Sequence, residues 1–231
     1  MSGTYMPKTP LARVVHAFEE NVIALLLGLM ALITFVNVVL RYIFNSGLIW
    51  GLELTLVLFA WLVMFGIAYG FKITMHLGVD ALLNIVGRGP RRLMALLTVG
   101  ICLIYALLLM KGAYDYWAPY ANLAPTTGRW FPTGFEEMKP WDFRGYVPTE
   151  RIPVPGFLRA PLEALFLPEG EDPYEKLPIV VPYTIIPVSV ALMVFRLAQA
   201  AMRIVSGEQD GLIVSHEAED AVEEAAAAKE G

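Results

Sequence analysis

Four long apolar runs without a charged side chain constrain this chain more than any other feature. They cover residues 22–40, 54–71, 93–110 and 177–195. Each is long enough to cross a hydrocarbon core of about 30 Å as an α-helix, which satisfies its own backbone hydrogen bonds. The composition agrees, since 57% of the residues are hydrophobic and only 17% are charged. We therefore predict an all-α membrane protein with four transmembrane helices.

Charges and prolines divide the chain around these runs. The first run could instead be a secretory signal, but it is longer than a signal's apolar core and no small-residue cleavage motif follows it before Arg41. An uncleaved first span is the better interpretation. The predicted order is a mobile cytoplasmic lead (1–15), three transmembrane helices with an interfacial arm (16–110), an external segment (111–176), a fourth transmembrane helix (177–204) and an acidic cytoplasmic tail (205–231).

The positive charges predict the orientation of the spans. Arg41 is the only basic residue in the short connection between the first two runs, and the connection 111–176 is too long for its charges to indicate topology. The basic residues on the opposite side are Lys8, Arg13, Lys72, Arg88, Arg91, Arg92, Arg196 and Arg203. Because basic residues favour the cytoplasmic side, we expect both termini in the cytoplasm. A net charge of −5 without a basic patch gives no indication of a nucleic-acid partner.

Three connecting stretches depart from plain spans. Between the second and third runs, apolar and polar residues alternate at near-helical spacing, which favours a short helix in the membrane interface over a plain loop. Residues 111–176 are rich in Pro and Trp, which indicates an ordered external lid without long helices, and 154–168 favour a short amphipathic helix on the membrane surface. Pro178, Pro182 and Pro187 predict that the last span is bent or locally unwound.

No pattern in the sequence carries catalytic or cofactor chemistry. The span centres hold no acidic, basic or His side chain, although such residues usually mark an ion or substrate pathway. His16, His76 and His216 are not placed as a pair of haem ligands, Cys102 is the only cysteine, and no paired carboxylates or nucleotide-binding loop occur. We expect no enzyme, cofactor or metal site. A membrane anchor of a redox enzyme and a small autonomous channel or exporter remain as alternatives to an accessory subunit.

The polar residues at the second span suggest an assembly surface instead. Gly66 and Gly70 form a GxxxG step that allows another helix to approach closely. Arg41 and Glu53 flank the same external connection, so they are expected to pair at the membrane boundary, with Trp50 at headgroup level. Two alternatives are that both charges reach water separately, or that they contact a partner subunit.

The stretch NVVLRYIFNSGLIWGLELTLVLFAWLVMFGIAYGFKITMHLGVDALL, residues 37–83, adds a resemblance. It contains Arg41-Tyr42-x-Phe44, Trp50-x-x-Glu53, a second span rich in aromatic residues and glycine, and His76-x-x-Val79-Asp80. Together these resemble the small integral membrane subunit of tripartite ATP-independent periplasmic (TRAP) transporters, the DctQ-like family. The similarity covers residues 15–110 and resumes weakly in the last span.

The resemblance implies a scaffold role beside larger partners. Its expected partners are a large DctM-like membrane subunit, which carries the substrate and sodium sites and moves as an elevator, a periplasmic substrate-binding protein, and membrane lipids. It adds His76 and Asp80 to the candidate assembly residues Arg41, Trp50, Glu53, Gly66 and Gly70. The long external segment departs from the family's usual short connection and resembles small subunits for 2-oxo acid, mannitol or chloroaromatic uptake.

Overall fold

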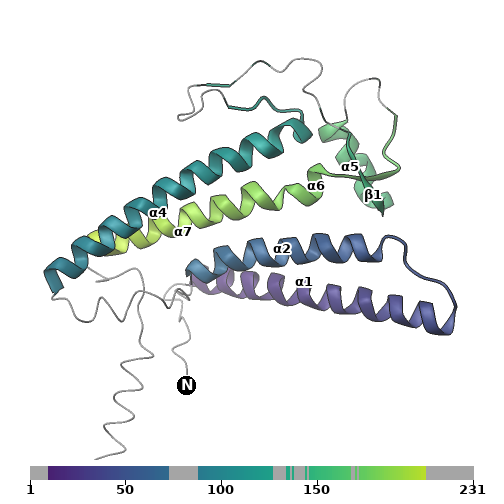
Figure 1. The fold of residues 1–231 in the computed structure, drawn as a ribbon, viewed down its shortest axis with the longest axis horizontal. Coiled ribbons are helices and arrows are strands. Elements are labelled where there is room, and N and C mark those ends of the chain that lie inside the picture. The colour runs from purple at the N-terminus through teal and green to yellow at the C-terminus, as the bar shows by residue number, and fades with distance from the viewer. Residues whose placement is uncertain are drawn as a thin grey trace, which may run out of the picture. The chain divides into compact units, whose positions relative to one another are not determined.

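The computed structural model describes residues 10–72, 88–126, 134–135, 137, 144, 146–167, 170 and 172–206. The predicted interfacial helix after the second span, the lead before residue 10 and the acidic tail lie outside these ranges. The chain divides into two units, Met1–Glu19 with Ile67–Ala106 and Leu192–Gly231, and Glu20–Gly66 with Leu107–Ala191. The long helices run from one unit into the other (Figure 1).

The first two helices are α1 (Pro10–Ile43) and α2 (Gly51–Lys72), with labels as in Figure 1. Asn45, in the left-handed conformation with φ 47°, follows the end of α1. The Asn37 Oδ1 accepts a 2.9 Å hydrogen bond from the Leu48 amide, which fixes the connection against α1. The first residue of α2 is Gly51, where a Cβ would lie 3.0 Å from the Leu48 Cβ, so a larger residue would need Leu48 to shift slightly.

Small residues line the packed face of the third span, α4 (Arg88–Trp117), which continues into the 3-10 helix η1 (Ala118–Ala121). Small side chains let membrane helices approach closely. Ala95 and Val99 are buried against Ile204 of α7 (Ile185–Ser206) in the first unit. The buried alanines continue along the same chain segment at Ala106, Ala113, Ala118 and Ala121.

The last span is broken, as its prolines predict. A short helix, α6 (Val180–Tyr183), is separated from α7 by Thr184. Pro187 has no amide to donate to the preceding turn. Two indoles supply donors at this break: Trp61 Nε1 donates to the Pro182 carbonyl over 2.9 Å, and Trp117 Nε1 lies 3.1 Å from Thr184 Oγ1.

The described part of the external segment forms a small cap, defined here as β1 (Pro148–Pro153), α5 (Gly156–Phe166) and β2 (Lys176–Pro178). The two strands pair antiparallel with an irregular register. Tyr174 is fully buried and stacks on Tyr146 at a ring-centroid distance of 4.5 Å. The Asn122 side chain donates to the Phe166 carbonyl over 2.9 Å, which attaches the cap to the segment that follows η1.

The predicted fold class is confirmed, because the described residues include four helices long and apolar enough to cross a membrane. The helices extend beyond the uncharged runs. α4 continues past Met110 because Lys111 and Asp115 pair over 2.6 Å one turn apart, so neither charge is left alone near the membrane. The two-stranded pairing in the cap was not predicted, since prolines at Pro148, Pro153 and Pro178 obscure a strand pattern.

Candidate functional site: the external end of α2

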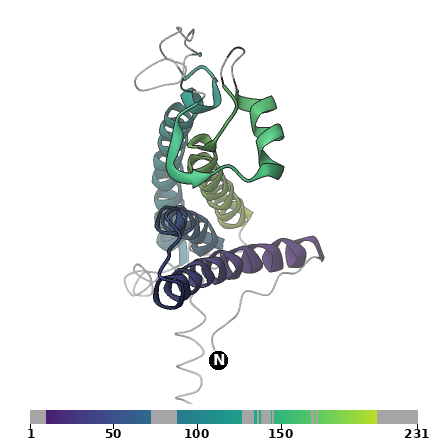
Figure 2. The ribbon, with the colours of Figure 1, turned by 90° about the vertical axis from the view of Figure 1, so that its right-hand side faces the viewer.

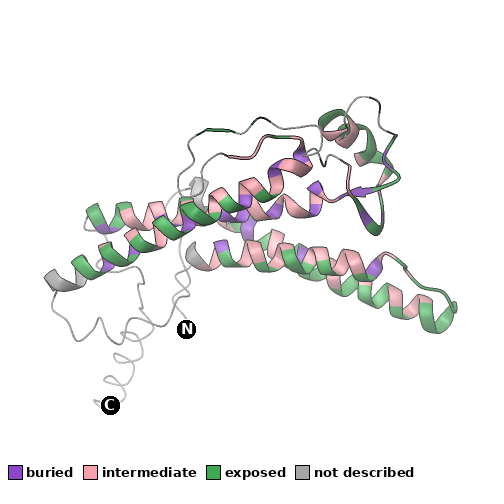
Figure 3. Cartoon of the chain, turned by 45° about the horizontal axis from the view of Figure 1, so that its top comes forward, coloured by how far each residue is buried: buried purple, intermediate pink, exposed green. Residues whose placement is uncertain are grey.

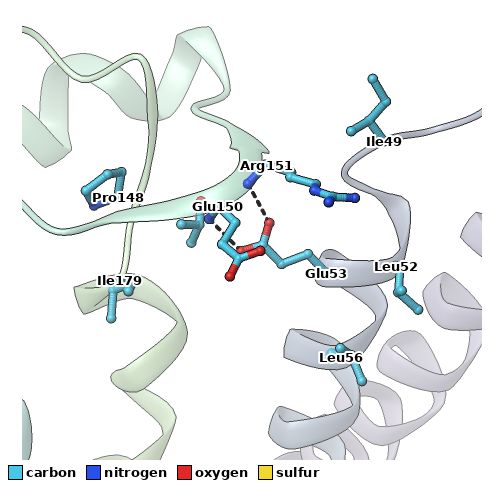
Figure 4. Close-up of a pocket in the computed structure, with 9 residues that line it drawn as sticks. Ile49, Leu52, Glu53, Leu56, Pro148, Glu150, Arg151 and Ile179 are labelled. Atoms are coloured by element: carbon cyan, nitrogen blue, oxygen red, sulfur yellow. Dashed lines mark hydrogen bonds between the residues drawn. The ribbon is translucent and has the colours of Figure 1, made fainter.

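Glu53 forms the best-defined polar contact at the external connection. It lies in the first turn of α2, where the partial positive charge of the helix N-terminus favours a carboxylate. Its two oxygens accept hydrogen bonds from the backbone amides of Glu150, at 2.8 Å, and Arg151, at 2.7 Å (Figure 4). Glu53 therefore joins α2 to β1, across almost a hundred positions of sequence. We call this contact the Glu53 clasp.

The irregular backbone of β1 makes the clasp possible. Successive amides of a regular strand point to opposite sides, so one carboxylate would reach only one of them. The register between β1 and β2 shifts between Pro148 and Pro153, as at a β-bulge. Lys176 Nζ also donates to the Glu150 carbonyl over 2.7 Å, which holds this irregular stretch from the β2 side.

A cavity of about 430 Å³ surrounds the clasp (Figure 4). Its apolar side includes Ile49, Leu52 and Leu56, and Arg151 is the only cation among its described lining residues. Each Glu53 oxygen accepts one backbone donor, so the observed contacts of this carboxylate are structural. Across the described ranges, no group of three or more His, Cys, Asp or Glu is placed to hold a metal ion.

Arg41 does not pair with Glu53, which corrects the expected ion pair. The Arg41 side chain is exposed in the last turn of α1, and no hydrogen bond or ion pair joins it to another described residue. Glu53 has backbone partners instead, and amides in a strand are held in place without the side-chain entropy cost of ordering an arginine. Arg41 still complements the negative end of α1.

Trp50, Gly66 and Gly70 make no contact with another described residue that explains an assembly role. The Trp50 carbonyl accepts the Leu54 amide at the start of α2, and its side chain is half-buried. Nothing lies within 4 Å of a Cβ built on Gly66 or on Gly70, so no described helix uses the GxxxG step within this chain. His76 and Asp80 lie outside the described residues, and their assembly role stays a prediction.

Sequence reasoning missed a buried ion pair in the first unit. The Glu19 Oε1 of α1 and the Arg196 Nη2 of α7 lie 2.5 Å apart. The side chains of Glu19 and Arg196 are only 8% and 11% exposed. Arg196 also donates to Gln199 over 3.0 Å. Both charges fall inside candidate spans, which begin at Arg13 and end at Ser206 and so exceed the uncharged runs. The sequence offered one indication of this pair: Glu19 lies just before the first apolar run, and Arg196 lies just after the last one.

A second missed network closes the end of α4. Asp115 accepts from the Thr126 amide at 2.6 Å and from the Thr126 hydroxyl at 2.7 Å, in addition to its pair with Lys111. Backbone and side-chain donors together satisfy this carboxylate, so it is a structural group that turns the chain back after η1. The sequence signal was the Lys-x-x-x-Asp spacing.

Comparison with known proteins assigns the family. Residues 30–135 match the family described as tripartite ATP-independent periplasmic transporters, DctQ component. The chain is 39% identical over 207 residues to the C4-dicarboxylate TRAP transporter small permease protein DctQ of Vibrio cholerae, covering 90% of this chain and 79% of that protein. The chain belongs to the DctQ family. It is a small permease subunit of a TRAP transporter and a multi-pass membrane protein, not an enzyme.

Two further relatives match over shorter stretches. The protein named C4-dicarboxylate TRAP transporter small permease protein DctQ in Pseudomonas aeruginosa is 37% identical over 133 residues, which are 46% of this chain and 63% of that protein. A putative TRAP transporter small permease protein of Haemophilus influenzae is 31% identical over 119 residues, or 51% of this chain and 74% of the relative. The resemblance recognised from the motifs is thereby confirmed.

Proposed function

We propose that this chain is the scaffold subunit of a TRAP system that takes up four-carbon dicarboxylates. One observation carries the substrate class: the relative matched over 90% of the chain is named as a C4-dicarboxylate small permease. This narrows the organic acid expected from the sequence and replaces the 2-oxo acid, mannitol and chloroaromatic substrates that the long external segment suggested.

The proposed partners have separate roles in transport. A large DctM-like membrane subunit carries the dicarboxylate and sodium sites and moves as an elevator, and a periplasmic protein delivers the substrate. The scaffold role is supported by how the polar groups of this chain are used. Glu19, Arg196, Glu53 and Asp115 all hold segments of the chain together. The contacts observed for these four side chains are all within this chain, as expected for a scaffold.

The apolar surface supports a large partner in the membrane. In α1, only Glu19 and Leu26 are buried among the residues whose side chains are described (Figure 3). Phe35 is 66% exposed and Phe59 of α2 is 52% exposed. Lipid can cover such side chains, but the open glycines Gly66 and Gly70 suit a closely packed helix of the large subunit better.

The proposal includes an orientation. The basic residues near the span ends favour cytoplasmic termini in the inner membrane of a bacterium. The cap and the Glu53 clasp then lie on the periplasmic side. His76 and Asp80, between the second and third spans, lie on the cytoplasmic side and remain proposed assembly residues.

Uptake in cells tests the proposal. The three genes of the system are expressed in a strain without dicarboxylate uptake, and entry of radiolabelled succinate is measured with sodium or potassium outside. We expect uptake that needs sodium, needs this chain, and falls when unlabelled fumarate or malate is added. A matched culture lacks only this chain.

The outcomes separate the parts of the proposal. Uptake that persists without this chain would contradict a required subunit. Uptake of a 2-oxo acid or an aromatic acid, but not of succinate, would contradict the substrate class and leave the subunit role intact. Uptake that is equal in sodium and potassium would contradict the coupling ion.

A further inference from the structure

The outer face of α5 carries apolar side chains where a water-exposed helix carries polar ones. The inner face consists of Leu158, Leu162 and Phe166, all half-buried, and of Glu163, which accepts the Tyr174 amide over 2.8 Å. The opposite face is exposed and has no polar side chain; it consists of Phe157, Ala160, Pro161, Ala164 and Leu165. We call these five residues the α5 outer face.

This pattern differs from that of an ordinary surface helix, because the exposed face is apolar as well as the inner one. A helix at the surface of a soluble domain turns its apolar stripe inward and its polar residues outward. Here Phe157 is 80% exposed and Leu165 is 72% exposed, two turns apart on the same side. Single exposed apolar residues need no explanation, but a whole helix face without a polar group does.

The attachments of α5 hold it near the ends of two candidate spans. Its last residue, Phe166, accepts a hydrogen bond from Asn122, and the candidate third span ends at the preceding residue, Ala121. Glu163 holds Tyr174, and β2 then leads directly into the fourth span, which begins at Val180. α5 is therefore tied to the chain within a few residues of the ends of two spans. Two candidate spans, defined by length and composition, therefore end close to α5.

The direction of α5 also fits a position in the interface. In Figure 2, α5 (green) runs down the right-hand side of the view, whereas α4 (teal) and the α6–α7 segment (yellow-green) recede from the viewer. A helix that crosses the spans at their ends lies along the membrane plane. Amphipathic helices in this position bury an apolar face about 5–10 Å into the headgroup and acyl boundary.

We propose that the α5 outer face inserts into the external leaflet and anchors the cap to phospholipid. The position is continuous with the lipid-facing ends of the spans, which is why lipid, and not a soluble protein, is the expected occupant. Arg159 is exposed on the opposite side of the helix, about half a turn away from this face, so its charge does not have to enter the leaflet. The inference does not depend on which substrate the transporter carries.

Depth-sensitive fluorescence tests the anchor. Cys102 is replaced by Ser, a single cysteine is introduced as Phe157→Cys or Leu165→Cys, and each is labelled with a fluorophore that responds to polarity. The full chain, with and without its large membrane subunit, is placed in nanodiscs of phosphatidylethanolamine and phosphatidylglycerol with a nitroxide near the headgroup end of the acyl chain. We expect at least about twofold stronger quenching than at Arg159→Cys, the matched position on the same helix.

Other results would overturn the proposal. Equal, weak quenching at all three positions would mean that the outer face is in water. Quenching that appears only after the large subunit or the binding protein is removed would mean that a protein covers this face. A photoactivatable lipid applied to the unsubstituted chain repeats the test without any mutation. Adducts in the peptide that contains Phe157 are expected, and their absence, with adducts present in the spans, would contradict the anchor.

Discussion

Glu19 and Glu53 are two carboxylates near the ends of long helices, and each holds together segments that are far apart in sequence. Glu19 is buried against the charged Arg196, with side-chain exposures of 8% and 11%. Glu53 instead accepts neutral backbone amides at a partly open cavity. The comparison shows that the contribution of such a contact to the free energy of unfolding depends on the partner's charge and on burial, and not on the carboxylate alone.

The physical reason lies in what remains after one partner is lost. When the carboxylate is removed, no water takes its place beside the buried guanidinium. The free-energy cost of removing that charge from water is then no longer offset, and the folded state is destabilised. A backbone amide at an open site can bond to water instead, and the net cost is that of one hydrogen bond. The first unit should therefore be sensitive to single charge changes, and the cap should be tolerant of them.

The largest effect is expected for Glu19→Gln. This change strands Arg196 and should lower the free energy of unfolding by about 3 kcal/mol, measured by denaturant titration of the purified chain in mixed micelles. The exposed neighbouring carboxylate supplies the control, Glu20→Gln, which should cost much less. The double variant Glu19→Gln with Arg196→Gln should lose clearly less than the sum of the two singles. A loss equal to that sum would contradict a coupled pair.

A smaller and more local effect is expected for Glu53→Gln. The neutral amide offers one acceptor oxygen in place of two charged ones, so the clasp should weaken by about 1.5 kcal/mol. Hydrogen exchange should become several-fold faster in the peptide that contains Glu150 and Arg151, and nowhere in α7. Glu150→Gln is the control, because it leaves the backbone amide in place. Unchanged exchange in the Glu53 variant would contradict the clasp.

Trp61→Phe should have a smaller effect on overall stability. Phenylalanine keeps most of the apolar contact but removes the donor to the Pro182 carbonyl, at a cost of about 1 kcal/mol. The free energy of unfolding in mixed micelles is compared with that of Trp50→Phe, since no hydrogen bond joins the Trp50 side chain to a described residue. Equal losses in both variants would show that the indole donor is not what matters at the break.

No coupling is expected between Arg41 and Glu53. Arg41→Ala and Glu53→Ala should combine additively within about 0.5 kcal/mol, because the two residues share no contact among the described residues. The stability of the assembled complex is measured for the wild type, both singles and the double. A double variant that loses clearly less than the sum would restore the ion pair expected from the sequence.

The lengths of the uncharged runs and the positions of the prolines were sufficient to predict the four spans and the break in the last one. The four spans follow from runs that no soluble domain needs, and the break at Thr184 follows from prolines that cannot donate to the preceding turn. Run length and proline position are local properties of the chain. They predict helices and breaks without any knowledge of which segments contact each other.

The site was predicted only in part, because its contacts are not local. The sequence indicated that Glu53 matters at the external connection but assigned it the nearest opposite charge, Arg41. Its partners are amides of β1, and a backbone amide has no side-chain signature in the sequence. The pair of Glu19 and Arg196 was missed for the same reason, since opposite ends of the chain bring the two charges together.

Reconstitution of purified components tests the central claim that this chain holds a transporter together and does not itself transport. The large subunit, this chain, or both are placed in liposomes with an inward sodium gradient, and the binding protein loaded with radiolabelled succinate is added outside. We predict uptake only when both membrane subunits are present, with reduced uptake for a complex that carries Glu53→Gln. Succinate entry into liposomes that contain this chain alone would contradict the claim.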